Sequence, residues 1–271
     1  VIAPLTLMTS QEEWENDPQG MMGSFLSQTI GVPELDGAIY PYLLTVEEKN
    51  ADGLYVLKAI PERLQKLTEL VQRFLSLQTK PNSQKRLAIY YFKGPGQSAL
   101  TAQGLEVVPS LYNLLLRLRS EGYDLTGLPA DEKTFEAQIM REGPIIQSIS
   151  GGQMEQYLKT GNPAWTSKQV FDEWLQRDLT PKQIKELVDQ YGASPGAYMA
   201  RSSKSGAPEL ATTRIQYGNV VILPQPIAGI GSDDFAIVHG AGSPPPYPYV
   251  AAYLWARHTF KADALMHFGT H

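Results

Sequence analysis

Residues Gly218–His271 decide the fold of this chain, and they read GNVVILPQPIAGIGSDDFAIVHGAGSPPPYPYVAAYLWARHTFKADALMHFGTH. The apolar runs Val220–Leu223 and Ala262–Phe268 have the length and composition of buried parallel strands. Between them, Tyr249–Phe260 repeats apolar residues at helical spacing after a proline cluster, which can precede a helix but cannot continue one. Strand, helix and strand in this order predict a crossover between two parallel strands. Ligands of open α/β sheets bind outside the carboxyl ends of such strands, so the loops that follow the two strands are expected to face one crevice.

The rest of the chain extends this pattern. Arg86–Phe92 is a β-rich run that leads through a glycine-bearing loop into a helix predicted over Val108–Ser120. Further upstream, Ile60–Leu77 is the clearest helix, and its leucine stripe is expected to face a core. The polar connector Lys80–Lys85 contains a proline and marks a boundary.

The fold class predicted is therefore α/β, with open, mostly parallel sheets and flanking helices, in parts of two or more domains of a larger chain. Residues 1–80 are expected to be the C-terminal part of a preceding α/β domain. Residues 81–271 are expected to be a second α/β core with a helical insertion at about 129–217. Within that insertion, the polar, glycine-containing stretch Gly192–Gly206 is expected to be a mobile or ligand-facing loop.

Composition excludes several classes of protein. The chain has 271 residues, 42% of them hydrophobic and 19% charged, which is typical of a soluble globular protein, and a cytoplasmic location is expected. It contains no cysteine, which excludes disulfides and thiolate metal sites within this span. The net charge of −5 argues against a nucleic-acid partner, which would favour a basic surface. No apolar run is long enough for a membrane-spanning helix.

All four histidines follow residue 217. His267 and His271 are four residues apart around Gly269, so they share a face of a continued strand or converge in a tight turn. Neutral imidazole binds divalent first-row metals and exchanges protons near neutral pH, so either arrangement permits a metal-binding or proton-transfer role. The alternative is that both are hydrogen-bonded residues at a strand end.

Other polar residues of this stretch also have two interpretations. His239 follows an apolar run, so it is a metal ligand or a residue that ends a strand. Asp233 and Asp234 follow two glycines, where an acidic pair binds a metal or caps a helix. His258 falls inside the predicted helix and is expected to be a packing or surface residue.

Several spaced motifs resemble those of the CobN and magnesium-chelatase H-subunit family. They are GNVVILPQP, GIGSDDFAIVHG, SPPPYPYVAAYLWAR and KADALMHFGTH, together with PELDGAIYP at residues 33–41 and the segment 80–128. The motifs occur in the family's order and the resemblance covers most of the chain. FKGPGQ at residues 92–97 departs from the proline-rich YPP-type loop of many members, and Tyr191 stands where a tryptophan is common in a W-G-x-x-P-G turn.

This resemblance implies the large subunit of an ATP-dependent tetrapyrrole metallochelatase, most closely a cobaltochelatase that inserts cobalt into a corrinoid during cobalamin biosynthesis. The substrates implied are a tetrapyrrole, either a corrinoid or a porphyrin, and a divalent metal ion, with cobalt favoured over magnesium or iron. In the family, ATP is hydrolysed by AAA+ partner subunits that act with adaptor subunits, and the chain agrees in having no P-loop motif. Because family members are far longer, the chain is expected to be an internal fragment that ends within HFGTH.

Metal insertion requires a base for two pyrrole protons and a cleft for a large flat ligand. We expect His267 and His271 to act as bases or metal ligands, with His239 as a further ligand. Glu106 is a second candidate base, or else a carboxylate favoured by a helix dipole. Candidate contacts to the tetrapyrrole are Gly94, Gln97, Gln225 and Asp234, and candidate stacking partners are Tyr198, Tyr247 and Tyr249.

Two other functions remain open. One is a CobN-like haem dechelatase that removes iron during haem uptake. This function stays open because the FKGPGQ loop departs from the loop of many family members. The other is a non-catalytic tetrapyrrole carrier or sensor. The metal content of the bound macrocycle before and after incubation separates these functions.

Overall fold

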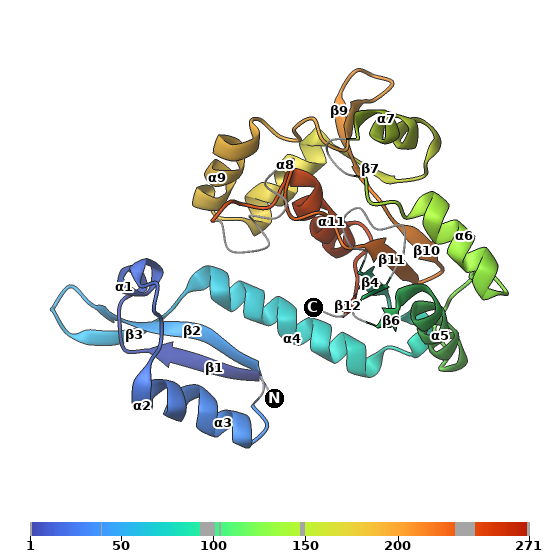
Figure 1. The fold of residues 1–271 in the computed structure, drawn as a ribbon. Coiled ribbons are helices and arrows are strands. Elements are labelled where there is room, and N and C mark those ends of the chain that lie inside the picture. Colours follow the sequence, from blue (N-terminus) through green and yellow to red (C-terminus); the bar gives the residue numbers. More distant parts are fainter. Residues whose placement is uncertain are drawn as a thin grey trace. The chain divides into compact units, whose positions relative to one another are not determined.

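The computed structural model describes residues 2–38, 40–92, 101–102, 104–146, 150–230 and 242–269. The chain divides into two compact units, Val1–Thr79 and Lys80–His271. Helices and strands alternate in both units (Figure 1), so the α/β class predicted from the sequence is confirmed. The first unit contains one sheet among its described residues, and the second contains several.

The first unit has a three-stranded sheet in the order β1-β2-β3. Strand β1 (Ile2–Leu7) is parallel to β2 (Tyr40–Lys49), and β3 (Tyr55–Ala59) is antiparallel to β2. The connection from β1 to β2 contains α1 (Gln11–Asn16), α2 (Gly23–Leu26), a π-helical turn (Ser27–Gly31) and α3 (Val32–Leu35). Helix α1 begins at Ser10, whose side chain accepts a hydrogen bond from the Glu13 backbone N–H while the Glu13 carboxylate accepts from the Ser10 N–H.

Helix α4 (Pro61–Thr79) forms where the leucine pattern predicts it, but its apolar stripe is not a core. Leu67 is buried, whereas Leu64 and Phe74 are 46% and 40% exposed. The core cluster found among the described residues of this unit is small: Leu43, Val46 and Ile60 are buried together, with Leu7 and Trp14 packed against them. Within the described residues of this unit most of the stripe is therefore exposed, and the expectation of a buried stripe was wrong here.

The second unit has a four-stranded sheet in the order β10-β11-β4-β12. Strand β4 (Leu87–Tyr91) lies between β11 (Val220–Pro224) and β12 (Ala264–Phe268) and is parallel to both, while β10 (Ile215–Tyr217) is antiparallel to β11. Every residue of β4 and β11 is buried. The mostly parallel sheet and its buried central strands therefore agree with the sequence pattern.

Helices cover both faces of this sheet. Alternate residues of β4 point to opposite faces, as the period of two requires. Ile89 and Tyr91 pack with residues of α5 (Val107–Ser120) and α6 (Glu132–Glu142). Ala88 and Tyr90 pack with α11 (Tyr247–His258), which confirms the predicted crossover from β11 through α11 to β12.

Strand β12 differs from its prediction because it is not buried. Among the described residues it is an outer strand of the sheet, with β4 as its neighbour, and Leu265 and Met266 are 44% and 39% exposed. Apolar composition suggested a buried strand, whereas within the part of the chain that the structure describes β12 pairs on one side, with β4.

The region 129–217 is not purely helical. It contains α6, α7 (Gly151–Thr160), α8 (Lys168–Asp178) and α9 (Pro181–Tyr191), as expected for a helical insertion. It also contains an antiparallel sheet in the order β7-β9-β8, built from β7 (Ala164–Ser167), β9 (Pro208–Thr212) and β8 (Ala200–Ser202). Strand β8 falls inside the predicted loop Gly192–Gly206, where Met199 is buried, so that stretch is partly core.

Burial raises the pKa of Tyr90, Tyr91, Tyr217 and Tyr253. A tyrosine of the unfolded chain ionises near about pH 10, whereas these four stay protonated in the folded state. The unfolded state therefore binds fewer protons above that pH, so stability is expected to fall as the pH rises beyond it. Tyrosinate absorbance from these residues should appear together with the loss of circular dichroism. Ionisation of these tyrosines while the circular dichroism remained intact would contradict their burial. Tyr90→Phe should reduce the rise in tyrosinate absorbance that accompanies unfolding at high pH.

Candidate functional site

His267 lies near the end of β12, opposite Tyr90 in the parallel register with β4. Its ring stacks on Tyr90, with 5.6 Å between ring centroids, and lies against Tyr253 of α11 at 6.0 Å. The residue is nevertheless exposed, because β12 is an outer strand. The His267 imidazole thus packs against two tyrosine rings and stays accessible to solvent. It lies at the carboxyl end of the sheet, where α/β proteins bind ligands.

Gln225 follows β11 directly and reaches the same cluster. Its backbone N–H donates to the Tyr91 carbonyl at 2.9 Å, which extends the parallel pairing past the strand end. Its side-chain Nε2 donates to the Tyr253 hydroxyl at 3.1 Å. Tyr253 therefore contacts both His267 and Gln225, so the structure brings together two residues that the sequence singled out separately.

The tyrosines of this cluster act as neutral hydrogen-bonding groups. Burial raises the pKa of Tyr90 and of Tyr253, so both phenols keep their protons. The Tyr90 hydroxyl donates to the Ala252 carbonyl at 2.9 Å, and the Tyr249 ring lies 5.2 Å from that of Tyr253. Imidazole is the side chain that exchanges protons near neutral pH, which makes His267 the candidate base among these groups.

Glu106 lies elsewhere in the second unit. It ends β6 (Leu105–Glu106), which pairs with β5 (Thr101–Ala102), and it is the N-cap residue of α5. Its side chain is exposed and makes no capping hydrogen bond. Within the described part of the chain, no hydrogen bond or ion pair joins it to His267 or Gln225.

Five of the predicted site residues lie outside the described residues: Gly94, Gln97, Asp234, His239 and His271. Asp233 lies outside them as well. Among the residues that are described, no three histidine, aspartate or glutamate side chains form a group that could hold a metal ion. His267 is thus the one described member of the predicted metal-binding set.

His258 is a packing residue, in line with one of its two interpretations. Its Nε2 pairs with Oδ2 of Asp178, and Arg257 Nη1 approaches the other oxygen of that carboxylate at 3.2 Å. The His258 ring stacks on Trp174 at 5.5 Å, and its side chain is 10% exposed. These contacts join the ends of α8 and α11 rather than forming part of the His267 cluster.

Two hollows share lining residues, and sequence reasoning did not find them; Gln225 lines the smaller one. The smaller is a cavity of about 50 Å³, and the larger is a cleft of about 380 Å³. Tyr198 and Pro248 line both hollows. Tyr249 lines the cavity and Tyr247 lines the cleft, so the three tyrosines proposed as stacking partners gather here. Tyr191, Pro195 and Gly196 also line the cleft. The turn that begins at Tyr191 was therefore the feature of the sequence that could have pointed to the cleft.

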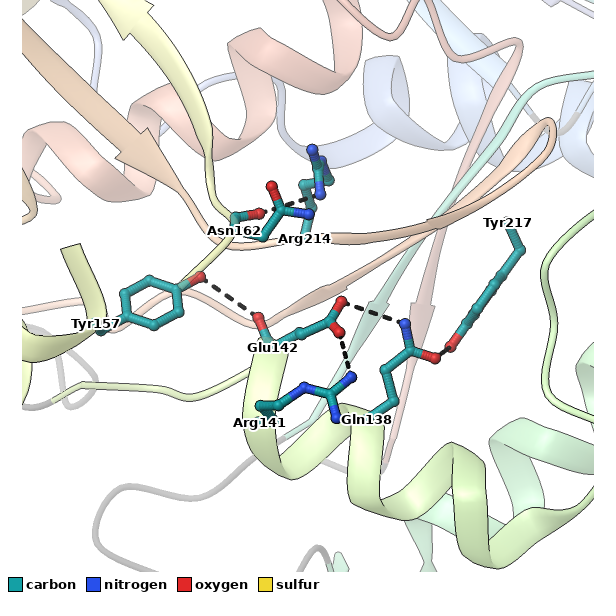
Figure 2. Close-up of polar contacts among 7 residues, drawn as sticks. All are labelled: Gln138, Arg141, Glu142, Tyr157, Asn162, Arg214 and Tyr217. Carbon is teal, nitrogen blue, oxygen red and sulfur yellow. Dashed lines mark hydrogen bonds and ion pairs between the residues drawn. The ribbon is translucent and has the colours of Figure 1, made fainter. Parts of the chain in front are cut away.

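A polar network fixes the end of α6 next to the cavity (Figure 2). The Glu142 carboxylate accepts hydrogen bonds from Gln138 Nε2 at 3.2 Å and from Arg141 Nη2 at 2.6 Å. The Tyr217 hydroxyl donates to Gln138 Oε1 at 3.0 Å, and the Tyr157 hydroxyl donates to the Glu142 carbonyl at 3.4 Å. Residues 144–146, which follow this network directly, form one wall of the cavity.

A family model described as CobN/Magnesium Chelatase matches residues 1–271. The chain belongs to this family. The resemblance inferred from the spaced sequence motifs is therefore confirmed.

Known members of the CobN/magnesium-chelatase family match this chain along nearly its whole length. It is 26% identical over 281 residues to the aerobic cobaltochelatase subunit CobN of Pseudomonas aeruginosa, covering 100% of this chain and 21% of that protein. It is 27% identical over 273 residues to the chloroplastic magnesium-chelatase subunit ChlH of Oryza sativa subsp. indica, and this match covers 100% of this chain and 18% of that protein. The structure of the catalytic subunit of cobaltochelatase from Mycobacterium tuberculosis matches with a TM-score of 0.79 and 26% sequence identity. This match covers 100% of this chain and 22% of that structure's chain.

The chain spans about a fifth of the length of these relatives. No helix within the described residues is both long enough and apolar enough to cross a membrane.

Proposed function

We propose that this member of the CobN/magnesium-chelatase family is part of the large subunit of a tetrapyrrole metallochelatase, and that the metal inserted is cobalt and the macrocycle a corrinoid. The observation that carries the proposal is the His267 cluster, in which an exposed imidazole is held on Tyr90 and Tyr253 beside the Gln225 amide. Two of the relatives named above are cobaltochelatase subunits, which favours cobalt over magnesium.

The reaction determines what these groups must do. Charge is conserved in the reaction because the divalent ion displaces the inner N–H protons of the macrocycle: the single one of a corrin, whose cobalt(II) complex then keeps one positive charge, or two from a porphyrin. The neutral imidazole of His267 accepts a pyrrole proton and passes it to solvent, to which the ring is exposed. The Gln225 amide hydrogen-bonds carboxylate or amide substituents of the macrocycle, and Tyr249 offers a ring for stacking.

The remaining assignments follow the family resemblance. ATP hydrolysis by AAA+ partner subunits, acting with adaptor subunits, drives the insertion. His271 and Glu106 are further bases, and His239 joins His267 and His271 in handing over the metal ion. Contacts to the tetrapyrrole come from Gly94, Gln97, Gln225 and Asp234.

Absorbance titration of the complete polypeptide with a metal-free corrinoid, metal-free protoporphyrin and haem tests this proposal. Tight binding of the corrinoid is expected, followed by cobalt uptake that requires ATP and the partner subunits. Replacing cobalt with magnesium provides the matched control and should leave the corrinoid metal-free. Preference for haem, with metal-free porphyrin accumulating, would instead identify a dechelatase. Binding of none of the three would remove the tetrapyrrole proposal.

A further inference from the structure

Asp263 lies directly before β12 and joins this strand to the start of β4. Its backbone N–H donates to the Arg86 carbonyl at 2.8 Å, and its Oδ2 accepts from the Arg86 backbone N–H at 2.9 Å. Its other oxygen, Oδ1, accepts from Lys80 Nζ at 2.6 Å. The Asp263 side chain is 9% exposed. Both carboxylate oxygens therefore hold β12 at the end where the strand begins.

The pair formed by Arg86 and Asp263 comes just before the paired residues of the two strands. Parallel pairing starts with the next residue of each strand and reaches Tyr90 opposite His267. Side chains of a strand alternate between its two faces, so a slip of one residue would turn His267 to the other face of the sheet. Its ring would then leave Tyr90 and Tyr253, against which it now packs. The position of the candidate base thus depends on this register.

Burial fixes the register of β12 only weakly. Apolar residues specify the pairing of a strand firmly when one of its faces is buried. Within the described part of the chain, none of the five residues of β12 is buried, whereas all five of β4 and all five of β11 are. The polar anchor at Asp263 supplies the specificity that burial does not.

The hydrogen bond to Arg86 is the part of the anchor that depends on geometry. Lys80 is 39% exposed, so solvent screens its ion pair with Asp263. Arg86, by contrast, presents a backbone N–H at a fixed place, and its Nη1 donates to the Phe260 carbonyl at 2.9 Å, which braces the turn between α11 and β12. The length of the side chain at residue 263, rather than its charge, therefore decides whether the anchor forms.

We propose that Asp263 is a positioning residue for His267, because its carboxylate fixes the register in which β12 pairs with β4. The inference rests on the proposed function, in which His267 is the base, and adds a residue that acts on His267 through the strand. His267 is four residues further along, which is about 13 Å in an extended strand. Asp263 can therefore act without touching the substrate.

Two variants of the complete polypeptide separate length from charge. Asp263→Asn keeps the length and an oxygen that can accept from the Arg86 N–H. Asp263→Glu keeps the charge but adds a methylene, so its carboxylate reaches that N–H only if β12 moves. Histidine NMR signals are recorded without substrate, and those of His267 are assigned by their loss in His267→Phe. Ring currents of Tyr90 and Tyr253 displace these signals, so they should change in Asp263→Glu and stay in place in Asp263→Asn.

The rate of cobalt uptake at saturating macrocycle gives a second readout. In Asp263→Glu it should fall by up to about 10²-fold, the cost of a misplacement of about 1 Å, while the dissociation constant of the macrocycle stays close to that of the parent protein. Asp263→Asn should keep most of the parent rate.

Asp178→Glu is the matched control. The Asp178 side chain is 7% exposed and pairs with Arg257 and His258, so the same lengthening disturbs another nearly buried carboxylate of the second unit. This variant should lower the thermal stability without changing the His267 signals or the rate.

Three results would overturn the inference. One is parent-like His267 signals in Asp263→Glu, and another is displaced signals in Asp263→Asn, which decides the matter even if Asp263→Glu does not fold. The third is a lower rate in Asp263→Glu that comes with equally weaker binding of the macrocycle. If the parent polypeptide took up no cobalt, the proposed function would fail, whereas the NMR signals, which need no substrate, would still decide whether Asp263 sets the position of His267.

Discussion

Replacing His267 with phenylalanine is expected to slow metal insertion by about 10²-fold to 10⁴-fold, the range that a positioned general base contributes. Phenylalanine keeps a ring that packs on Tyr90 and Tyr253 but has no nitrogen to accept a pyrrole proton. Binding of the metal-free macrocycle should therefore stay close to that of the parent protein. The measurement is the rate of cobalt uptake at saturating macrocycle, with ATP and the partner subunits present.

His258→Gln is the matched control. It also removes an imidazole that stacks on an aromatic ring, but that ring belongs to Trp174 and the histidine pairs with Asp178. Its rate per folded molecule should equal that of the parent protein, while its thermal stability should fall because Asp178 loses a partner. A parent-like rate in His267→Phe would exclude His267 as the base and would favour His271 or Glu106.

The sequence predicted the central crossover well, because both strands and the helix have strong local patterns. The helix was expected over Tyr249–Phe260 and is observed over Tyr247–His258. Its start is two residues earlier because Pro248 falls in the first turn, where proline lacks only an N–H that has no helical partner. The pattern therefore predicted the element and misplaced its ends.

Burial was harder to predict because it depends on neighbours. The periodicity of α4 identifies which side is apolar but does not say whether a sheet is wide enough to cover it. The same reasoning failed for β12, whose composition resembles that of a central strand. Strands β8 and β9 were missed because Ala200–Ser202 is only three residues long and Pro208–Thr212 begins with a proline, so neither carries a strong strand signal.

The candidate site was predicted in part. His267 and Gln225 stand out in the sequence because each follows or ends an apolar strand. Tyr253, which connects them, looks like an ordinary apolar residue of a helix, and only its contacts show its position. Thr212 ends a strand that the sequence did not predict, so the cavity was beyond sequence reasoning.

Phe135→Ala is expected to lower the free energy of unfolding of the second unit by about 3–5 kcal/mol, as in other truncations of buried aromatic residues. Phe135 is 0% exposed and comes from α6. Its ring lies 5.2 Å from that of Tyr112 and 6.2 Å from that of Tyr217, so truncation removes contacts with two further rings and leaves a cavity. Urea unfolding followed by tryptophan fluorescence measures the loss, since Trp165, Trp174 and Trp255 lie in this unit and Trp14 lies in the other.

Met140→Ala separates this effect from any general weakening of α6. Met140 belongs to the same helix but is 45% exposed, so its truncation should change the free energy of unfolding by no more than about 0.5 kcal/mol. Equal losses in the two variants would show that Phe135 is not part of a packed core. A large loss confined to Phe135→Ala would mean that α6 is held on the sheet by this ring. The helix in turn carries Gln138 and Glu142, whose hydrogen bonds fix the chain just before the cavity wall at residues 144–146.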